Sequence, residues 1–524
     1  MIRAKQPQSE IVIDLTGPQG NAFQLMAYAK QLATRLGMNY HVIIDEMKHL
    51  VHAEYTHDND PSSGHRGNDR RIYLNEEIDQ NGEFFKPGYY IVFFKYLDTE
   101  DKETKYILYR FTPDHKQYDL LEKITNQNQP YTRLVFSKEF YEGRSWLRDQ
   151  YKSLELSVST DEVGNLIGLL KTNKKTDKLV IIGSHIDTVP SGGRYDGIAG
   201  VVSALCVINH IRINDINLPF NLAVYDYLGE ELNDWGTSCI GSRGIAGVLN
   251  QEILSRKNTA GLVLKEEIDK IGGNSALLNK PLPVIENILA CLELHIEQGK
   301  VLEDRKIDIG VVRSIPSISR FSVSVKGQAG HSGTILMNQR SDALVTASEI
   351  ISFVNKSALK LSQKSNQHFV ATIGKINVHP NSAAIIPGFV EMTIDLRATS
   401  QNSREEFLNI LNKKISLLND TSSCNVKIKD IAFAPYVEMD KDLINLFKNC
   451  ANSLGLSNTI MDSGAGHDTA QLSRVVPAGM IFIPCKDGLS HCPEEYAEVS
   501  DISKGTAVLW KMVQNLENQN SNIT

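Results

Sequence analysis

Residues 183–197, with the sequence GSHIDTVPSGGRYDG, follow the apolar run 179–182 and decide how the rest of the chain is interpreted. The run is long enough for a buried strand, and the glycines after it predict a loop. His185, Asp187 and Asp196 would then lie at the carboxyl end of a strand, where open α/β sheets bind ligands. Imidazole and carboxylate groups together suit a divalent transition metal. On this stretch alone, two interpretations are equally supported. The stretch could form a metal site, or it could be a loop in which these residues have no function.

Helices and strands alternate on both sides of this stretch. Strands alternating with helices predict an α/β fold, a mostly parallel sheet with helices on both faces. Near residue 317 the pattern changes, because 321–325 alternates with period two like a half-exposed strand. The helix, two strands, helix and strand that follow predict an inserted, smaller α+β domain with an open sheet of the ferredoxin-like type. The α/β pattern then resumes and ends in a strand at 480–483 and a C-terminal helix.

Four segments follow from these changes of pattern. They are an N-terminal accessory region at 1–115, the first part of the α/β domain at 116–316, the insertion at 317–430, and the second part of the α/β domain at 431–524. The accessory region is expected to hold a small helical unit up to about residue 55 and a hairpin formed by 89–94 and 105–111. It carries no recognisable chemistry, so its role is left open.

Composition narrows the class of protein. With 524 residues, 41% hydrophobic and 22% charged residues and a net charge of −7, the chain is an ordinary multidomain protein without a basic field for nucleic acid. It has no apolar window of about 18 residues for a membrane span and no signal-peptide core. Its seven cysteines are scattered, odd in number and without CxxC, which predicts reduced thiols and a cytoplasmic location.

Further polar groups follow other predicted strands. Glu230 and Glu231 end the strand at 222–227, and because neighbours on an extended chain point opposite ways, one can bind metal while the other faces a substrate. A single histidine or acid of this kind would more often be structural. Taken together, the groups make coincidence a poor explanation. The histidines concerned lie at the end of an apolar strand, in a glycine-rich loop of the insertion and on either side of the strand at 480–483: His295, His331, His467 and His491.

These motifs carry a resemblance. The pieces GSHIDTV and GGRYDG, ELHIEQG (293–299), GQAGHSGT (327–334), SGAGHD (463–468) and SHCPEE (490–495) occur in the order found in one family. The chain resembles the metal-dependent amidohydrolases of the M20 peptidase superfamily over residues 131–513. Within it, the carbamoylase branch is the most similar: N-carbamoyl-L-amino-acid hydrolases, β-ureidopropionases and allantoate amidohydrolases. The ELHIEQG piece separates that branch from M20 peptidases, which typically carry an acid at the position of His295.

The resemblance implies a site with two divalent ions per subunit, Zn²⁺, Mn²⁺, Co²⁺ or Ni²⁺. Asp196 would bridge the ions and Asp187 would orient His185. Glu230 would be the general base, and the substrate would be contacted by Gln298, His467 and Arg397. His331 would polarise the attacked carbonyl from the partner subunit of a homodimer, in which the insertion serves as dimerisation or lid domain. The remaining ligands would be His185 and His295 for one ion, and Glu231 and His491 for the other.

The implied activity is hydrolysis of a linear amide or ureido C–N bond, not a peptide bond in a protein, in a small carboxylate-bearing substrate. N-carbamoyl amino acids and allantoate-like ureides are examples. An aminoacylase or dipeptidase, and a metal-bound binding module that uses the N-terminal extension, are the alternatives. Two departures from the family pattern leave the substrate open: Ala384 stands where an Asn is usual, and Asp234 stands where an Arg is usual.

Overall fold

The computed structural model describes residues 120–364 and 368–521, together with five short strands nearer the N-terminus. Those strands form a three-stranded antiparallel sheet and a separate antiparallel hairpin. The predicted hairpin is confirmed, whereas the helical unit expected up to about residue 55 lies outside the described residues except for two strands. In chain order the strands are β1 (Ile2–Ala4), β2 (Glu10–Asp14), β3 (Arg71–Asn75), β4 (Val92–Leu97) and β5 (Thr104–Tyr109).

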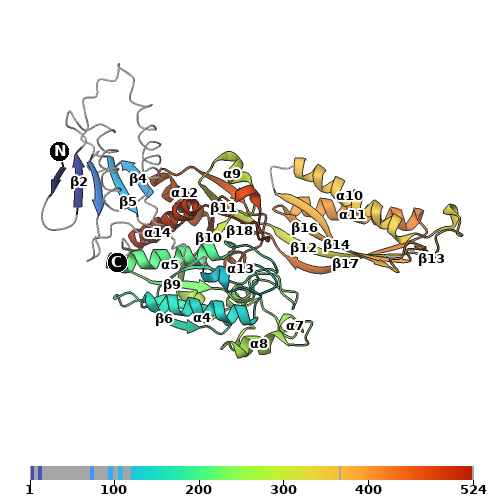
Figure 1. Cartoon of the computed structure of the whole chain (residues 1–524), viewed down its shortest axis with the longest axis horizontal. Helices are drawn as coiled ribbons and strands as arrows, with labels where there is room; N and C mark the ends of the chain where they lie inside the picture. Colours follow the sequence, from blue (N-terminus) through green and yellow to red (C-terminus); the bar gives the residue numbers. More distant parts are fainter. Residues whose placement is uncertain are drawn as a thin grey trace, which may run out of the picture.

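A mixed sheet of nine strands forms the larger body of the molecule (Figure 1). Its centre is parallel: β8 pairs with β9 and β10, and β10 pairs with β20. The predicted mostly parallel sheet is therefore confirmed, with antiparallel strands toward both edges. Its members are β6 (Ser157–Thr160), β7 (Leu166–Leu170), β8 (Leu179–Ser184), β9 (Asn221–Asp226), β10 (Ile288–Ile296), β11 (Ile309–Ile315), β18 (Val437–Glu438), β19 (Asn458–Asp462) and β20 (Ala478–Ile483).

Helices cover this sheet on both sides. α5 (Ile198–Ile213) packs on β8, β9 and β10 and against α14 (Val499–Ser521), which in turn packs on α12 (Lys441–Ser453). α5 is apolar on nearly every side and has eleven buried residues, as a helix between a sheet and a second helix requires. α4 (Lys138–Ser153) lies on the opposite side of the sheet in Figure 1. Ser137 caps α4 by accepting a hydrogen bond from the backbone N–H of Phe140.

Short helices complete the loops of this larger body. Most of them lie between β9 and β10, and the others are close in the chain to β10 or β20. They are α6 (Ile240–Ile245), α7 (Gln251–Leu254), α8 (Leu264–Lys270), η1 (Ser275–Leu277), η2 (Pro283–Asn287), α9 (Val301–Arg305), α13 (Asp468–Leu472) and η4 (Lys486–Gly488).

A second, four-stranded antiparallel sheet forms the inserted domain, with the order β14-β16-β12-β17 and two long helices on one face (Figure 1). The order β-α-β-β-α-β along the chain is that of a ferredoxin-like fold, as predicted. Burial along β12 alternates at each residue, so one face of the sheet meets the helices. The elements are β12 (Ser317–Lys326), β13 (Gly330–His331), η3 (Met337–Gln339), α10 (Ala343–Lys364), β14 (Phe369–His379), β15 (Ile385–Ile386), β16 (Phe389–Ala398), α11 (Gln401–Thr421) and β17 (Asn425–Ala434).

Each of the two bodies has its own apolar core. One core unites residues from before and after the insertion, from Leu121 to Leu516, and the other lies between the small sheet and its two helices. The chain leaves the large sheet at β11 and returns at β18, while β17 of the small sheet runs to Ala434. The segment limits 116–316, 317–430 and 431–524 stay a prediction, and 1–115 lies mostly outside the described residues.

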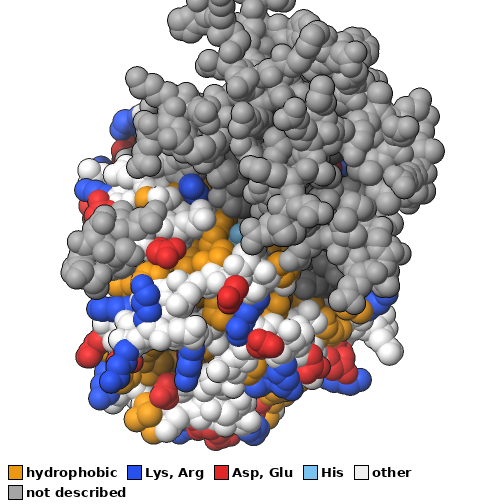
Figure 2. Space-filling model, turned by 90° about the vertical axis from the view of Figure 1, so that its left-hand side faces the viewer, with side chains coloured by type: hydrophobic (Ala, Val, Ile, Leu, Met, Phe, Trp, Pro, Cys, Tyr) orange, Lys and Arg blue, Asp and Glu red, His pale blue; other side chains and the backbone are white. Residues whose placement is uncertain are grey.

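The surface agrees with the charge pattern of the sequence. On the face shown in Figure 2, Lys and Arg side chains are interspersed with Asp and Glu among the described residues. Among the described helices, none combines the length and apolar character needed to cross a membrane.

Candidate metal centre

The predicted site residues come together at the carboxyl ends of parallel strands in the large sheet. His185 directly follows β8, the acid pair Glu230 and Glu231 comes after β9, and His295 is near the end of β10. His491 follows β20 by a short loop. Since β8, β9, β10 and β20 run in the same direction, their carboxyl ends meet at one edge, and residues 306 positions apart in the chain (491 minus 185) become neighbours.

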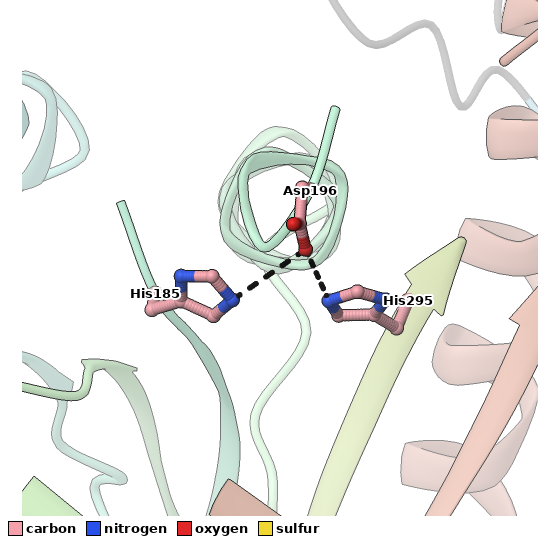
Figure 3. A group of neighbouring side chains, drawn as sticks. All are labelled: His185, Asp196 and His295. Atoms are coloured by element: carbon pink, nitrogen blue, oxygen red, sulfur yellow. Dashed lines mark ion pairs between the residues drawn. The ribbon is translucent and has the colours of Figure 1, made fainter. Parts of the chain in front are cut away.

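Three buried side chains form a first group that can hold a cation: His185, Asp196 and His295. In Figure 3 both imidazoles point at the carboxylate of Asp196, which lies between them. Asp196 Oδ1 is 3.0 Å from His295 Nε2 and 3.8 Å from His185 Nε2. All three side chains are at most 5% exposed.

A second group shares Asp196 with the first and adds Glu231 and His491. His491 Nε2 lies 3.1 Å from Asp196 Oδ2 and 3.3 Å from Glu231 Oε1. The side chain of His491 is 49% exposed, so this group opens toward solvent while the first is enclosed. The backbone of His491 has a φ of 57°, a left-handed conformation that is uncommon for a residue with a side chain and typical of functional sites.

Glycine makes room for the first group. Gly197 has a φ of 69°, and a Cβ at this position would lie 2.5 Å from the ring of His185. Any other residue would push the imidazole away and strain the backbone. Gly197 is also the N-cap of α5, which begins at Ile198, and its main-chain N–H lies 3.3 Å from His295 Nε2.

The acid pair is held by Asp187. Its carboxylate accepts hydrogen bonds from the main-chain N–H groups of Glu230 at 3.2 Å and Glu231 at 3.1 Å. His185 Nδ1 is 3.0 Å from the main-chain carbonyl of Asp187 but 3.7 Å from its carboxylate. His185 Nδ1 is thus closer to the main-chain carbonyl of Asp187 than to its carboxylate, and the orienting role that the resemblance implies for Asp187 stays a prediction. Glu230 Oε2 lies 3.8 Å from His185 Nε2.

Charge is concentrated in this buried space. Burial, together with the charge of Glu231, raises the pKa of Glu230 well above its usual range. Burial acts in the same direction on Asp196, but hydrogen bonds from His295 and His491 outweigh it and hold the pKa of Asp196 well below its usual range. The nearby carboxylates of Asp196 and Glu231 raise the pKa of His491 to about 11.

These residues fit bound metal ions. Within the described residues, the ion-pair partners of Asp196, Glu230 and Glu231 are all histidines. Buried Oε1 of Glu231 makes no hydrogen bond to any described residue, although it is within ion-pair distance of His491. Buried carboxylates need compensating charge, and nitrogen and oxygen donors in two groups that share one carboxylate would receive it from divalent cations. The chain therefore carries His and carboxylate groups that could bind metal.

Of the residues predicted to contact substrate, Gln298 and His467 lie beside these groups, and Arg397 contacts the loop that leads to His467. Gln298 donates hydrogen bonds from Nε2 to Asp196 Oδ2 at 3.3 Å and Ser490 Oγ at 3.0 Å. The ring of His467 is 4.6 Å from that of His295, and its Nε2 has no hydrogen-bond partner within the described part of the chain. Arg397, on β16, donates to Asp395 and to the main-chain carbonyl of Gly464 in the loop that leads to His467.

Comparison with known proteins identifies this arrangement. The sequence profile described as peptidase family M20/M25/M40 matches residues 181–515. The chain belongs to this family. The prediction of an M20-type hydrolase is thus confirmed, and the relatives and the solved structure carry names from its carbamoylase branch.

Two relatives and one solved structure illustrate the likeness within the M20 family. An N-carbamoyl-L-amino-acid amidohydrolase of a Pseudomonas species is 33% identical over 383 residues, covering 73% of this chain and 92% of that protein. An allantoate amidohydrolase of Bacillus subtilis is 31% identical over 386 residues, covering 74% and 92%. The crystal structure of a hydantoinase/carbamoylase family amidase from Burkholderia multivorans has a TM-score of 0.68 at 29% identity, covering 77% and 97%.

His331 is the one predicted site residue that lies far from the metal groups of its own chain. It is exposed on β13, at the end of the small domain that points away from the large sheet (Figure 1). Ala384, where M20 carbamoylases usually carry Asn, is its neighbour, because the carbonyl of Ala384 accepts the N–H of Ser332 at 3.0 Å. Asp234 is exposed at another place, and its carboxylate accepts a hydrogen bond from the hydroxyl of Thr259.

Sequence reasoning missed several buried polar residues that support the M20 site. Glu495 accepts the main-chain N–H groups of Tyr195 and Asp196, and Cys239 Sγ lies 3.5 Å from Glu230 Oε1. Glu293 accepts hydrogen bonds from the hydroxyl groups of Ser184 and Thr469 beneath the site. Glu293 and Glu495 stand inside the quoted motifs ELHIEQG and SHCPEE, so their position beside predicted ligands was a usable signal. No such signal marks Cys239.

Proposed function

We propose that this M20 protein is a two-metal hydrolase that cleaves a linear amide or ureido C–N bond in a small substrate with a carboxylate. The observation that carries the proposal is the sharing of Asp196 between two groups of potential ligands. Shared carboxylates hold two ions a few ångströms apart, the arrangement used for hydrolysis by a bound water. In this proposal His185 and His295 complete one site, and Glu231 and His491 complete the other.

The substrate class is supported by the names of the relatives. They act, by name, on N-carbamoyl-L-amino acids and on allantoate, which are ureides that carry a carboxylate. We propose an N-carbamoyl amino acid or an allantoate-like ureide for this chain as well. Ala384 and Asp234 depart from the family pattern, so the individual substrate is left to experiment.

In the proposed mechanism, divalent ions held by these residues would supply an acidified water and would polarise the carbonyl that is attacked. Glu230 takes the proton of that water and delivers it to the leaving nitrogen. Its position supports this role, because Glu230 stands beside the ligand groups but belongs to neither. Asp187 fixes the main chain of the acid pair, which would keep Glu230 oriented as the base and Glu231 oriented as a ligand.

The donor set supports Zn²⁺, Mn²⁺, Co²⁺ or Ni²⁺ and does not discriminate among them. Two ions per subunit would be bound. The exposed His491 would make the second ion the easier one to exchange, because solvent reaches that side of the group.

Substrate contacts are proposed for Gln298, His467 and Arg397. Gln298 and His467 are next to the ligand groups, and His467 has an imidazole nitrogen free to bind an incoming polar group. The planar fork of Arg397 suits the carboxylate of the substrate. His331 would act on the substrate from the partner subunit of a homodimer, since it is exposed at the far end of its own small domain.

One experiment tests the proposed reaction. The full-length protein, reconstituted with Mn²⁺ or Zn²⁺, is assayed with N-carbamoyl amino acids, allantoate, N-acyl amino acids and dipeptides. We expect ureide hydrolysis, and we expect Glu230→Gln to lower kcat by about 10²- to 10⁴-fold. Glu142→Gln, at an exposed position of α4, is the matched control. Cleavage of dipeptides or N-acyl amino acids alone would instead establish the alternative of a dipeptidase or aminoacylase.

The other alternative is a metal-bound binding module that uses the N-terminal extension. The Glu230→Gln variant can be expressed in a strain from which the gene has been deleted. If the variant restores every phenotype, the result favours the binding module over a hydrolase. For both functions we propose small-molecule ligands, without nucleic-acid or membrane partners, and a cytoplasmic location. That location is supported by the seven cysteines, all of which are free thiols.

A further inference from the structure

A closed ring of hydrogen bonds connects the loops that carry Asp196 and His491, and the carboxylate of Glu495 is its central member. Glu495 lies only four residues after His491 (495 minus 491), yet its side chain is 3% exposed and turns inward. Glu494, beside it, is exposed. A buried carboxylate is costly unless its oxygens accept hydrogen bonds, so the contacts of Glu495 indicate what it does.

One oxygen of Glu495 holds the loop of the shared ligand. Oε1 accepts the main-chain N–H of Tyr195 at 2.8 Å and of Asp196 at 2.9 Å. These two bonds fix the peptide that carries the side chain of Asp196. They also join parts of the chain that are 299 and 300 positions apart, one before and one after the insertion.

The other oxygen of Glu495 holds the loop of His491. Oε2 accepts the hydroxyl of Ser490 at 2.7 Å. The oxygen of Ser490 in turn accepts Nε2 of Gln298 at 3.0 Å, and the same Nε2 donates to Asp196 Oδ2 at 3.3 Å. Through Ser490 and Gln298 the ring closes on the carboxylate of Asp196, the group shared by both ligand sets.

Gly193 shows that the backbone is shaped around this carboxylate. A Cβ on Gly193 would lie 2.0 Å from Cδ and Oε2 of Glu495. No side chain fits there while Glu495 keeps its place, so the second glycine of the GGRYDG motif has a steric partner far away in the chain.

We propose that Glu495 is a positioning residue that sets the affinity of the second ion, held by Asp196, Glu231 and His491. The inference rests on the proposed two-metal function. His185 and His295 of the first group are fixed by β8 and β10, whereas His491 stands on a loop, half exposed. Loss of the ring therefore frees His491 more than it frees the histidines of the first group. Residues that orient metal ligands typically change metal affinity by about 10- to 100-fold when they are removed.

The test is a titration of the metal-free, full-length protein with Co²⁺, followed by calorimetry and by the visible absorption of each bound ion. We expect wild type and the control Glu494→Gln to bind two ions. Glu495→Ala should bind the second ion about 10- to 100-fold more weakly and the first within about threefold of wild type. Glu495→Gln keeps an acceptor for the two N–H groups. Its affinity for the second ion should therefore lie between those of wild type and Glu495→Ala.

Gly193→Ala provides a second approach, because it displaces the carboxylate without deleting it, and it should reproduce the selective loss of the second ion. Circular dichroism confirms that each variant is folded. Wild-type affinity for both ions in Glu495→Ala overturns the inference and leaves the proposed function intact. Equal weakening of both ions also overturns it. A wild-type protein that binds fewer than two ions overturns the inference and the two-metal function together.

Discussion

The carboxylate of Asp187 accepts the main-chain N–H of Glu231 at 3.1 Å and also that of Glu230, so one side chain holds the backbone of both acids. Asp187→Ala would leave two N–H groups without an acceptor in a buried place. We expect activity to fall by about 10- to 100-fold. We also expect the second ion to bind more weakly, because Glu231 would lose its orientation. Steady-state kinetics and metal analysis measure both. Asp177→Asn, at an exposed position before β8, is the control. Unchanged kinetics in Asp187→Ala would show that the acids hold their place without it.

Removal of metal should separate the two groups of ligands. We expect a chelator to abolish activity, with the second ion leaving first because His491 is half exposed and the first group is buried. His491→Ala should retain about one ion per chain, and Asp196→Ala should retain none with high affinity, because both groups share Asp196. Elemental analysis after dialysis gives the number of metal ions bound per chain. Two tightly bound ions in Asp196→Ala would contradict the shared carboxylate.

The candidate ligands could be found in the sequence because their chemistry is local, and their roles stay predictions. His185 and Asp196 stand in one short loop behind an apolar strand. His295 is near the end of β10 and His491 comes after β20, and a parallel sheet brings these strand ends to the same edge. What escaped prediction depends on distant packing. The motif around Glu495 marks the residue, but its contact with Asp196 spans 299 positions, so no spacing in the chain shows that the two residues meet.

Side-chain direction was the other limit of sequence reasoning. The family resemblance implied that the carboxylate of Asp187 orients His185, whereas in the fold this carboxylate accepts hydrogen bonds from the loop after β9. For His331, a proposed role in another subunit cannot be read from spacing along the chain, because distances between subunits depend on assembly.

The proposed role of His331 across a homodimer can be tested by mixing two inactive variants. His331→Ala lacks the proposed donor, and Glu230→Gln lacks the base. A mixed dimer contains one site with Glu230 from one chain and His331 from the other. After unfolding and refolding together, random pairing should restore about a quarter of wild-type activity, since half of the dimers are mixed and each has one complete site. Each variant alone, treated in the same way, is the control. No recovery in a mixture that forms dimers would contradict action across subunits.

Arg397 should affect substrate binding more than chemistry. Its guanidinium is held by Asp395 on one side and the carbonyl of Gly464 on the other, so its direction is fixed. We expect Arg397→Lys to raise KM by about 10-fold or more with a smaller change in kcat, because an ammonium group cannot reproduce the bidentate contact. Lys375→Ala, exposed on β14, is the matched control. A fall in kcat with unchanged KM would contradict a role in holding the carboxylate.

His210 should make stability depend on pH away from the metal centre. Its ring packs on Trp510, with 4.9 Å between ring centroids, and burial lowers its pKa to about 4. The unfolded chain, with a histidine pKa of about 6.5, takes up the proton first, so stability is complete above about pH 6.5 and falls as the pH decreases toward 4. Because the ring is partly exposed, water screens the effect to about 1 kcal/mol at pH 5. His210→Gln carries no titrating group at this position. In melting curves of the metal-free proteins, wild type should therefore lose more stability than His210→Gln between pH 7 and pH 5. An equal loss in the two proteins would show that His210 is protonated as readily in the folded chain as in the unfolded one.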